Sequence, residues 1–145
     1  MAYDEQCTVD LTVQCVGFAR DWLCRESGVI FAEIDIAADI WDKITHYIRK
    51  NDGARLPVDS YENGAVSPPA KGDFLVYCQQ FLGTGHVAIV TEVDIVNHYV
   101  GVCEQNYRNR FQRPDDIRSI PLITHNNRFW LLDGYLIGWK RMAGS

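Results

Sequence analysis

The sequence predicts an α+β fold, with N-terminal helices packed on an antiparallel β-sheet. Apolar residues recur at helical spacing in the first half of the 145 residues, whereas β-branched runs separated by turn residues fill the second half. An order of helices first and strands later is typical of α+β folds, because doubly wound sheets alternate the two. The length is that of one domain with a single hydrophobic core.

Two helices are expected near the N-terminus. From Cys15 onward, apolar residues follow at offsets of three, four, seven and eight positions, and Gly28 is a natural end to this pattern. A second helix is expected from about Asp35 to Lys50, where isoleucines supply one apolar face. The connector Asn51–Asp73 is rich in glycine and proline, and a loop of this length in a small domain often lines a site.

The second half is expected to form strands. The segment that ends the chain carries Asp133-Gly134, a dipeptide typical of hairpin turns, between two of them. The expected strands are Phe74–Cys78, His86–Ile95, His98–Gln105, Phe129–Leu132 and Tyr135–Met142.

Composition excludes several classes of protein. Lysine and arginine total 14 against 19 acidic residues, and a net charge of −5 disfavours general binding to nucleic acid or to an anionic membrane. No apolar run is long enough to cross a membrane, and the acidic start differs from a signal peptide, so we expect a cytoplasmic protein or export without a signal. Five cysteines without a CxxC pair indicate free thiols in a reducing compartment.

Cys15 is a candidate nucleophile because it lies at the expected first turn of the first helix. There the helix dipole and unpaired backbone N–H groups favour a thiolate, especially beside an imidazolium. The alternative is that Cys15 is a small core residue on the apolar stripe, which is the commoner role of a lone free cysteine.

His86 and Glu104 are a candidate pair on neighbouring strands. If the hairpin turn between the strands centres near Ile95, the two residues lie opposite each other, with Cβ atoms about 4.5–5.5 Å apart. The carboxylate would then fix the imidazole tautomer, and Asn106 on the same face could support it. A slip by one residue would separate the pair, and a lone histidine at a strand start is more often structural.

Taken together, these residues have the arrangement of a cysteine amidohydrolase. Cys15 would be the nucleophile, His86 the base and Glu104 the group that orients the base. The side-chain amide of Gln14 and the backbone N–H of Cys15 could stabilise a developing oxyanion.

Five motifs occur in the order and spacing of the CHAP family, the cysteine- and histidine-dependent amidohydrolases/peptidases. They are QCVGFARDWL, GDFLVYC, TGHVAIVTEV, CEQNY and YLIGW. The resemblance covers Gln14 to Lys140, and within the family it is strongest to the amidase domains of glutathionylspermidine synthetase/amidases. It implies a papain-like (NlpC/P60–CHAP) fold and a single catalytic domain over residues 1–145.

The resemblance also implies an activity that needs no metal or organic cofactor. It assigns six roles: Cys15 as nucleophile, His86 as general base and then acid, Glu104 as orienting group, Asn106 as auxiliary polar group, Gln14 as oxyanion donor and Arg20 as a substrate contact.

The favoured substrate is a small peptide-like amide such as glutathionylspermidine. The alternative is a peptidoglycan amidase or endopeptidase that cuts wall peptides, either as a phage lysin or as a secreted antibacterial effector. An effector would have an immunity protein as its partner. Neither a nucleic acid nor a membrane is an expected partner.

Three further interpretations stay open. The chain could be an inactive binding module that keeps the cleft, although the presence of all three candidate catalytic residues argues against this. Tyr107–Arg113 holds three arginines and two aromatic residues, which fits a nucleic-acid patch or, better, a loop that reaches substrate carboxylates. A zinc site of mixed cysteine and histidine is disfavoured because close ligand pairs are lacking.

Overall fold

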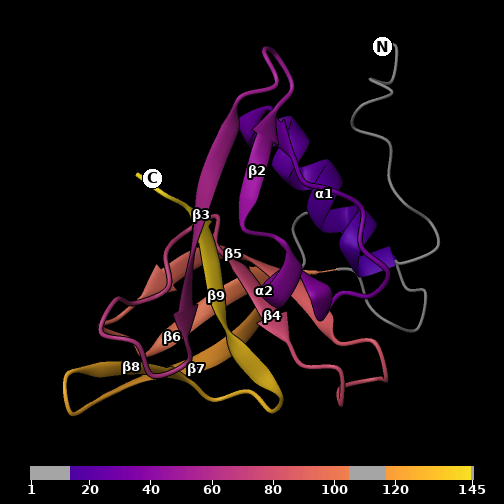
Figure 1. The fold of residues 1–145 in the computed structure, drawn as a ribbon. Coiled ribbons are helices and arrows are strands. Elements are labelled where there is room, and N and C mark those ends of the chain that lie inside the picture. Colours follow the sequence, from indigo (N-terminus) through magenta and orange to yellow (C-terminus); the bar gives the residue numbers. More distant parts are fainter. Residues whose placement is uncertain (1–13, 105–116, 145) are drawn as a thin grey trace.

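A computed structural model describes residues 14–104 and 117–144 of the chain (Figure 1). The elements in chain order are α1 (Gln14–Ser27), β1 (Val29–Ile30), α2 (Asp39–Lys43), β2 (His46–Arg49), β3 (Arg55–Glu62), β4 (Phe74–Tyr77), β5 (His86–Asp94), β6 (Tyr99–Cys103), β7 (Arg118–His125), β8 (Arg128–Leu131) and β9 (Leu136–Met142).

One antiparallel sheet dominates the described part of the chain. Its nine strands lie in the order β1-β2-β3-β9-β4-β5-β6-β7-β8, and each neighbouring pair is antiparallel. Within the same residues there are two helices, of which α2 has only five residues. The predicted α+β, papain-like arrangement of N-terminal helices on a sheet is therefore wrong, and the fold is mostly antiparallel β-sheet.

The expected second helix over Asp35–Lys50 accounts for much of this error. Only α2 is helical there, and β2 follows it in an antiparallel pair with β3, where Tyr47 lies opposite Leu56. The isoleucine spacing fits one helix face, but the same residues also serve a short helix followed by a strand. The β-branched and aromatic side chains near Tyr47 favour the strand once β3 offers a partner.

The first helix is confirmed, and it carries the candidate nucleophile near its start. Val16, Ala19 and Leu23 are buried at offsets of three and seven residues, and they join the core between α1 and the sheet. Gly28 ends α1 with φ of 65°, and its N–H donates to the carbonyl of Cys24 at 3.0 Å. This left-handed conformation costs glycine little, which explains the stop.

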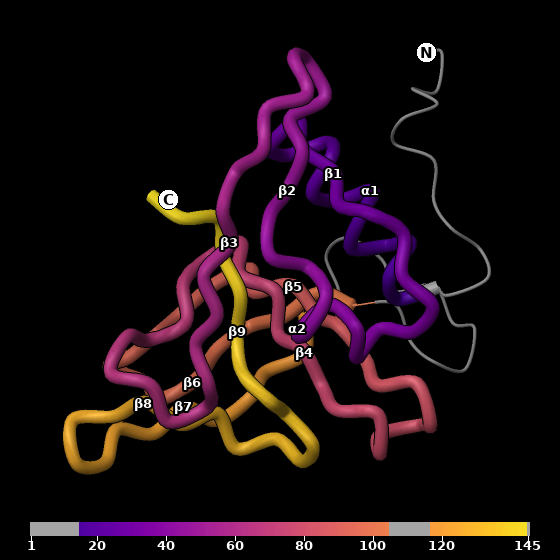
Figure 2. Tube along the Cα trace, viewed as in Figure 1, coloured from indigo at the N-terminus to yellow at the C-terminus, as the bar shows by residue number. Residues whose placement is uncertain are grey.

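The sheet curls so that β8 returns to the segment just after β3 (Figure 2). The N–H of Gly64 donates to the carbonyl of Phe129 at 2.8 Å, and the side chain of Asn63 bonds both the N–H and the carbonyl of Leu131. The outer edge of β8 is thus covered. The expected hairpin across Asp133-Gly134 is wrong, because β9 pairs with β3 and β4 instead of β8.

Two hydrophobic cores lie on opposite faces of the central strands. Phe74 and Val76 of β4 face the core under α1, whereas Leu75 and Tyr77 face the core inside the curled sheet. Every residue of β4 is buried, and burial of one large apolar side chain contributes about 1.5–3 kcal/mol. The central strands are therefore firmly held, and the candidate site lies at their end.

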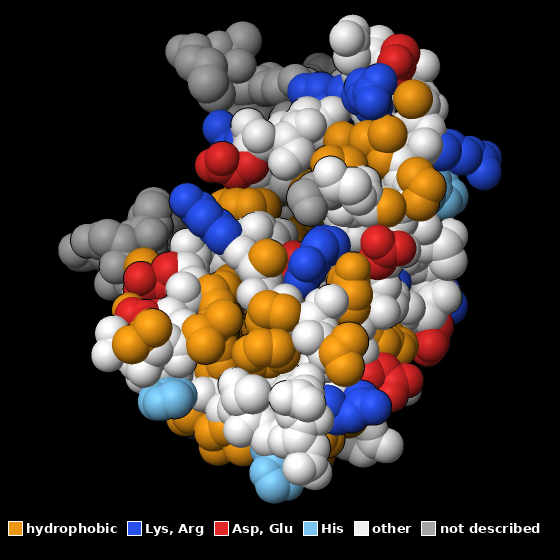
Figure 3. Space-filling view, turned by 90° about the vertical axis from the view of Figure 1, so that its left-hand side faces the viewer, with side chains coloured by type: hydrophobic (Ala, Val, Ile, Leu, Met, Phe, Trp, Pro, Cys, Tyr) orange, Lys and Arg blue, Asp and Glu red, His pale blue; other side chains and the backbone are white. Residues whose placement is uncertain are grey.

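The surface is not uniformly polar. Figure 3 shows hydrophobic side chains gathered on the lower half of one face. Exposed apolar residues near the β7–β8 hairpin include Ile123, Trp130 and Leu132. Neither described helix has the length and apolar character that a membrane span requires.

The cysteines differ in redox state. Cys15, Cys78 and Cys103 are thiols, whereas Cys24 is disulfide-bonded. The expectation that all five cysteines are free is therefore wrong at Cys24, and Cys7 lies outside the described residues.

Candidate active site

His86 is the first residue of β5 and follows a tight turn that ends at Gly85. Gly85 has φ of 75°, and a Cβ there would lie 2.5 Å from the carbonyl oxygen of Tyr77. Tyr77 and His86 are partners across the β4–β5 ladder, with ring centroids 5.4 Å apart, and the ring of Phe81 lies 5.8 Å from the imidazole. The imidazole is 5% exposed, so these rings fix its orientation.

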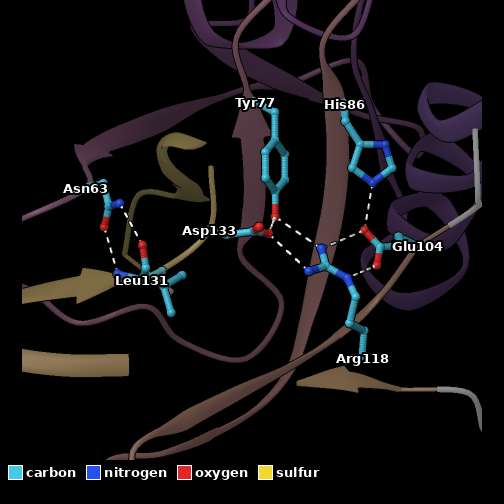
Figure 4. A network of polar contacts seen from close by, with 7 residues as sticks. All are labelled: Asn63, Tyr77, His86, Glu104, Arg118, Leu131 and Asp133. Carbon is cyan, nitrogen blue, oxygen red and sulfur yellow. Dashed lines mark hydrogen bonds and ion pairs between the residues drawn. The ribbon is translucent and has the colours of Figure 1, made fainter. Parts of the chain in front are cut away.

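Glu104 directly follows β6 and contacts His86, as the sequence predicts. Its Oε1 lies 2.7 Å from Nε2 of His86, and both side chains are buried (Figure 4). The expected register is nevertheless shifted, because Val90 pairs with Val102 and the ladder has an irregularity just beyond Val90. The shift is two residues, so Glu104 stays on the same face and reaches His86 as a diagonal neighbour.

Cys15 lies in the first turn of α1 and contacts the same imidazole. Burial alone would lower the pKa of His86, but the interactions with the Cys15 and Glu104 side chains outweigh burial and raise this pKa to about 9. Nε2 is taken by Glu104, and Nδ1 is buried without a hydrogen-bond partner of ordinary geometry among the described residues. Nδ1 is therefore the ring nitrogen left for Cys15.

The arrangement can place a proton on the Cys15 side of the imidazole while Glu104 holds the other side. The predicted contact between His86 and Glu104 is present in the structure. The catalytic roles of Cys15, His86 and Glu104 stay predictions.

Arg118 is a member of the site that sequence reasoning missed. It opens β7 and bonds both oxygens of Glu104, at 2.5 Å from Nε and 3.0 Å from Nη2. Burial opposes the charge of Glu104, but hydrogen bonds and charges from His86 and Arg118 lower its pKa to about 2. A single arginine in a strand that the sequence analysis did not assign gave no signal of this contact.

The other predicted site residues are not brought to this cluster by described contacts. The guanidinium of Arg20 lies over the ring of Phe31, 5.2 Å from its centroid, so its role as a substrate contact stays a prediction. Asn106 and the side chain of Gln14 lie outside the described residues, as does Tyr107–Arg113. Among the residues with described placement, no group of three histidine, cysteine or acidic side chains is arranged to hold a metal ion.

Comparison with known proteins supports an amide hydrolase. The chain is 30% identical over 136 residues to the bifunctional glutathionylspermidine synthetase/amidase of Escherichia coli (strain K12), which covers 87% of this chain and 21% of that protein. It is also 30% identical over 121 residues to the trypanothione synthetase of Crithidia fasciculata, covering 82% of this chain and 18% of that protein. The chain thus spans about a fifth of the length of these relatives.

The similarity to a named amidase and the family match agree in supporting a hydrolase that acts on amide bonds. The family match extends over residues 3–106, more than half of the chain, and includes Cys15, His86 and Glu104. The chain therefore belongs to the CHAP domain family.

Proposed function

We propose that this chain is a cysteine amidase that works through a covalent acyl-enzyme on Cys15. The observation that carries the proposal is the environment of His86: Nε2 is bonded to Glu104 at 2.7 Å, while Nδ1 is left for Cys15. This division of the two ring nitrogens is what a base needs if it is to exchange a proton with a nucleophile.

The reaction follows from these positions. The Cys15 thiolate attacks the amide carbonyl, and a tetrahedral oxyanion forms, for which the backbone N–H of Cys15 and the Gln14 side chain are the proposed donors. Nδ1–H of the His86 imidazolium gives its proton to the leaving amine, and the carbon–nitrogen bond breaks. The neutral Nδ1 then takes a proton from water, whose oxygen attacks the thioester, and the acid product and the thiolate are released with His86 again protonated.

The favoured substrate is a small peptide-like amide such as glutathionylspermidine, cleaved between glycine and spermidine. The similarity to a protein named as a glutathionylspermidine amidase supports this choice. Asn106 and Arg20 are proposed as auxiliary contacts, the latter to substrate.

The test uses intact mass spectrometry and turnover. Wild-type chain mixed with glutathionylspermidine should show a transient acyl adduct and release spermidine, whereas Cys15→Ala should do neither. Purified muropeptides in a parallel reaction test the peptidoglycan alternative. If wild type cleaves only muropeptides, the substrate assignment is wrong; if it cleaves neither and Cys15 reacts with iodoacetamide no faster than Cys78, the amidase proposal itself is wrong.

A further inference from the structure

Arg118 makes polar contacts with three different side chains around the site. Besides its two bonds to Glu104, its Nη1 donates to Oδ2 of Asp133 at 3.0 Å, and its Nη2 donates to the hydroxyl of Tyr77 at 3.2 Å (Figure 4). The Tyr77 hydroxyl in turn donates to Asp133 at 2.6 Å. The guanidinium is therefore fixed on three sides.

These contacts close a ring across four neighbouring strands. Tyr77 of β4 is the ladder partner of His86 of β5, which bonds Glu104 at the end of β6. Glu104 bonds Arg118 of β7, and Arg118 returns to Tyr77. A ring of this kind holds the Glu104 carboxylate in one orientation, since a guanidinium fork matches a carboxylate in one plane.

The ring also decides which oxygen faces the imidazole. Oε2 accepts from Arg118 Nε, while Oε1 accepts from both Arg118 Nη2 and His86 Nε2. An ionised carboxylate can only accept, so the bonded Nε2 must carry the proton in both the neutral and the charged imidazole. A buried Glu104 that became protonated could donate instead, and the ring proton would then move to Nδ1.

We propose that Arg118 is a positioning residue of the amidase: it keeps Glu104 an ionised acceptor for Nε2–H of His86, and so keeps Nδ1 available toward Cys15. This inference rests on the proposed function. Among the described contacts, the charged and titratable groups that touch Glu104 are His86 from β5 and Arg118 from β7, with Tyr77, Asp133 and Cys15 one contact further away. Of these, Arg118 is the group that neutralises Glu104 without taking part in proton transfer.

The pKa directions are consistent with this role. Burial raises the pKa of Glu104, and the arginine helps His86 to reverse that effect. Burial opposes the charge of Arg118, but its contacts with Glu104 outweigh burial and raise the pKa of Arg118, so the guanidinium keeps its charge.

Three variants separate charge from geometry. Arg118→Met removes both, Arg118→Lys keeps the charge but loses the fork, and Arg128→Met is the matched control, because Arg128 is a strand arginine bonded only to the Gly64 carbonyl among the described contacts. Two readouts are measured for each: the pH dependence of Cys15 alkylation by iodoacetamide, located by peptide mapping, and the tautomer of His86 by ¹⁵N NMR. Thermal unfolding checks that each variant is folded.

We expect Arg118→Met to slow amide turnover about 10- to 100-fold with little change in KM, the size typical of a lost supporting contact. In the plot of Cys15 alkylation rate against pH, the low-pH rise of this variant (the acid limb) should shift to higher pH by about one unit or more. In the same variant, the neutral imidazole of His86 should carry its proton on Nδ1. Arg118→Lys should keep the wild-type acid limb with a reduced kcat, and Arg128→Met should match wild type.

Arg118 is 40% exposed, so a small solute can reach its place. Guanidinium chloride, at concentrations far below those that unfold proteins, should restore part of the activity of Arg118→Ala. A merely structural role would give lower thermal stability with an unchanged tautomer and pH profile, and that result overturns the proposal.

The two proposals fail in different ways. If wild type shows neither amide cleavage nor fast alkylation of Cys15, the amidase function is wrong, although the NMR tautomer still reports whether Arg118 acts on His86. If wild type is active and Arg118→Met keeps the wild-type tautomer and acid limb, the role of Arg118 is wrong and the amidase stands.

Discussion

At the scale of single residues, Lys140 is a buried charge that serves structure. It is 2% exposed, and its Nζ donates to the carbonyl oxygens of Ile40, Trp41 and Ile44, at 2.8, 2.9 and 2.5 Å. These carbonyls lie at or near the C-terminal end of α2, where a helix leaves acceptors unpaired. One side chain of β9 therefore holds the short helix against the sheet.

Replacing Lys140 by methionine should destabilise the fold. The apolar side chain keeps the volume but leaves three carbonyls without this donor, so the free energy of unfolding should fall by about 1–3 kcal/mol. Lys43→Met is the control, because Lys43 is exposed and its ion pair with Asp39 at 3.4 Å contributes about 0–1 kcal/mol. Urea unfolding of both variants at neutral pH measures the difference, and equal effects would contradict the capping role.

The shifted pKa of Lys140 also makes the stability of the fold depend on pH. Burial lowers its pKa from 10.5 to about 8, against the opposing charge of Asp42. Between these two values the folded chain binds fewer protons than the unfolded chain, so this group makes stability rise with pH. The stability difference between wild type and Lys140→Met should therefore grow from about pH 8 to about pH 10.

At the scale of elements, the turn before β5 sets the position of His86. Gly85 combines φ of 75° with a close approach, since a Cβ there would lie 2.5 Å from the Tyr77 carbonyl oxygen and 2.8 Å from Cβ of Ala38. Gly83 has nearly the same φ, 78°, but a Cβ there would meet nothing within 4 Å. A comparison of substitutions at Gly83 and Gly85 therefore separates the effect of backbone strain from the effect of steric crowding.

Alanine at these two positions should therefore have unequal effects. Gly83→Ala should cost about 1–2 kcal/mol of stability from the left-handed conformation alone, with amidase activity largely kept. Gly85→Ala should cost more and should also reduce kcat, because the crowding moves the residue next to His86. Thermal unfolding and turnover of the two variants provide the comparison; identical losses would mean that the close approach to Tyr77 is unimportant.

Sequence reasoning succeeded for elements whose signal is local. The periodicity after Cys15 and the stop at Gly28 predict α1, and runs of apolar and β-branched residues predict β4, β5 and β6. The contact of His86 with Glu104 was predicted from face alternation, and it survives a register shift because two residues restore the same face.

The errors concern elements that depend on distant partners. β3 contains Pro57 and faces solvent over much of its length, so it has no strong strand pattern, and it forms because β2 and β9 flank it. β9 enters the middle of the sheet, which the Asp133-Gly134 hairpin signal could not indicate. Arg118 was missed for the same reason, because its role depends on the curl that brings β7 close to Tyr77.

At the scale of the whole molecule, the site lies where both cores end. Cys15 packs against the core beneath α1, whereas Tyr77 belongs to the core inside the curled sheet, and His86 touches both residues. The relative placement of nucleophile and base is thus set by the packing of α1 on the sheet. A change in either core can alter activity without touching the site.

Because the pKa values of His86 and Glu104 change on folding, the protonation of these two side chains contributes to the free energy of unfolding. The folded-state pKa of His86 is raised from 6.5 to about 9, so the folded chain binds more protons than the unfolded chain between these values. The stabilisation is fully present below 6.5 and is lost as pH rises through 9. The pKa of Glu104 is lowered from 4.5 to about 2, so its part is present above 4.5 and is lost as pH falls through 2.

Comparison of wild type with His86→Gln isolates the alkaline part of this effect, because Lys140 is common to both chains and its opposite pH dependence cancels. Urea unfolding at about pH 6, 7.5 and 9 should show the stability advantage of wild type falling steadily across the series. A constant or growing advantage would mean that His86 is not held in its charged form by Cys15 and Glu104. Since the proposed reaction needs this imidazolium to protonate the leaving amine, such a result would also remove its general acid.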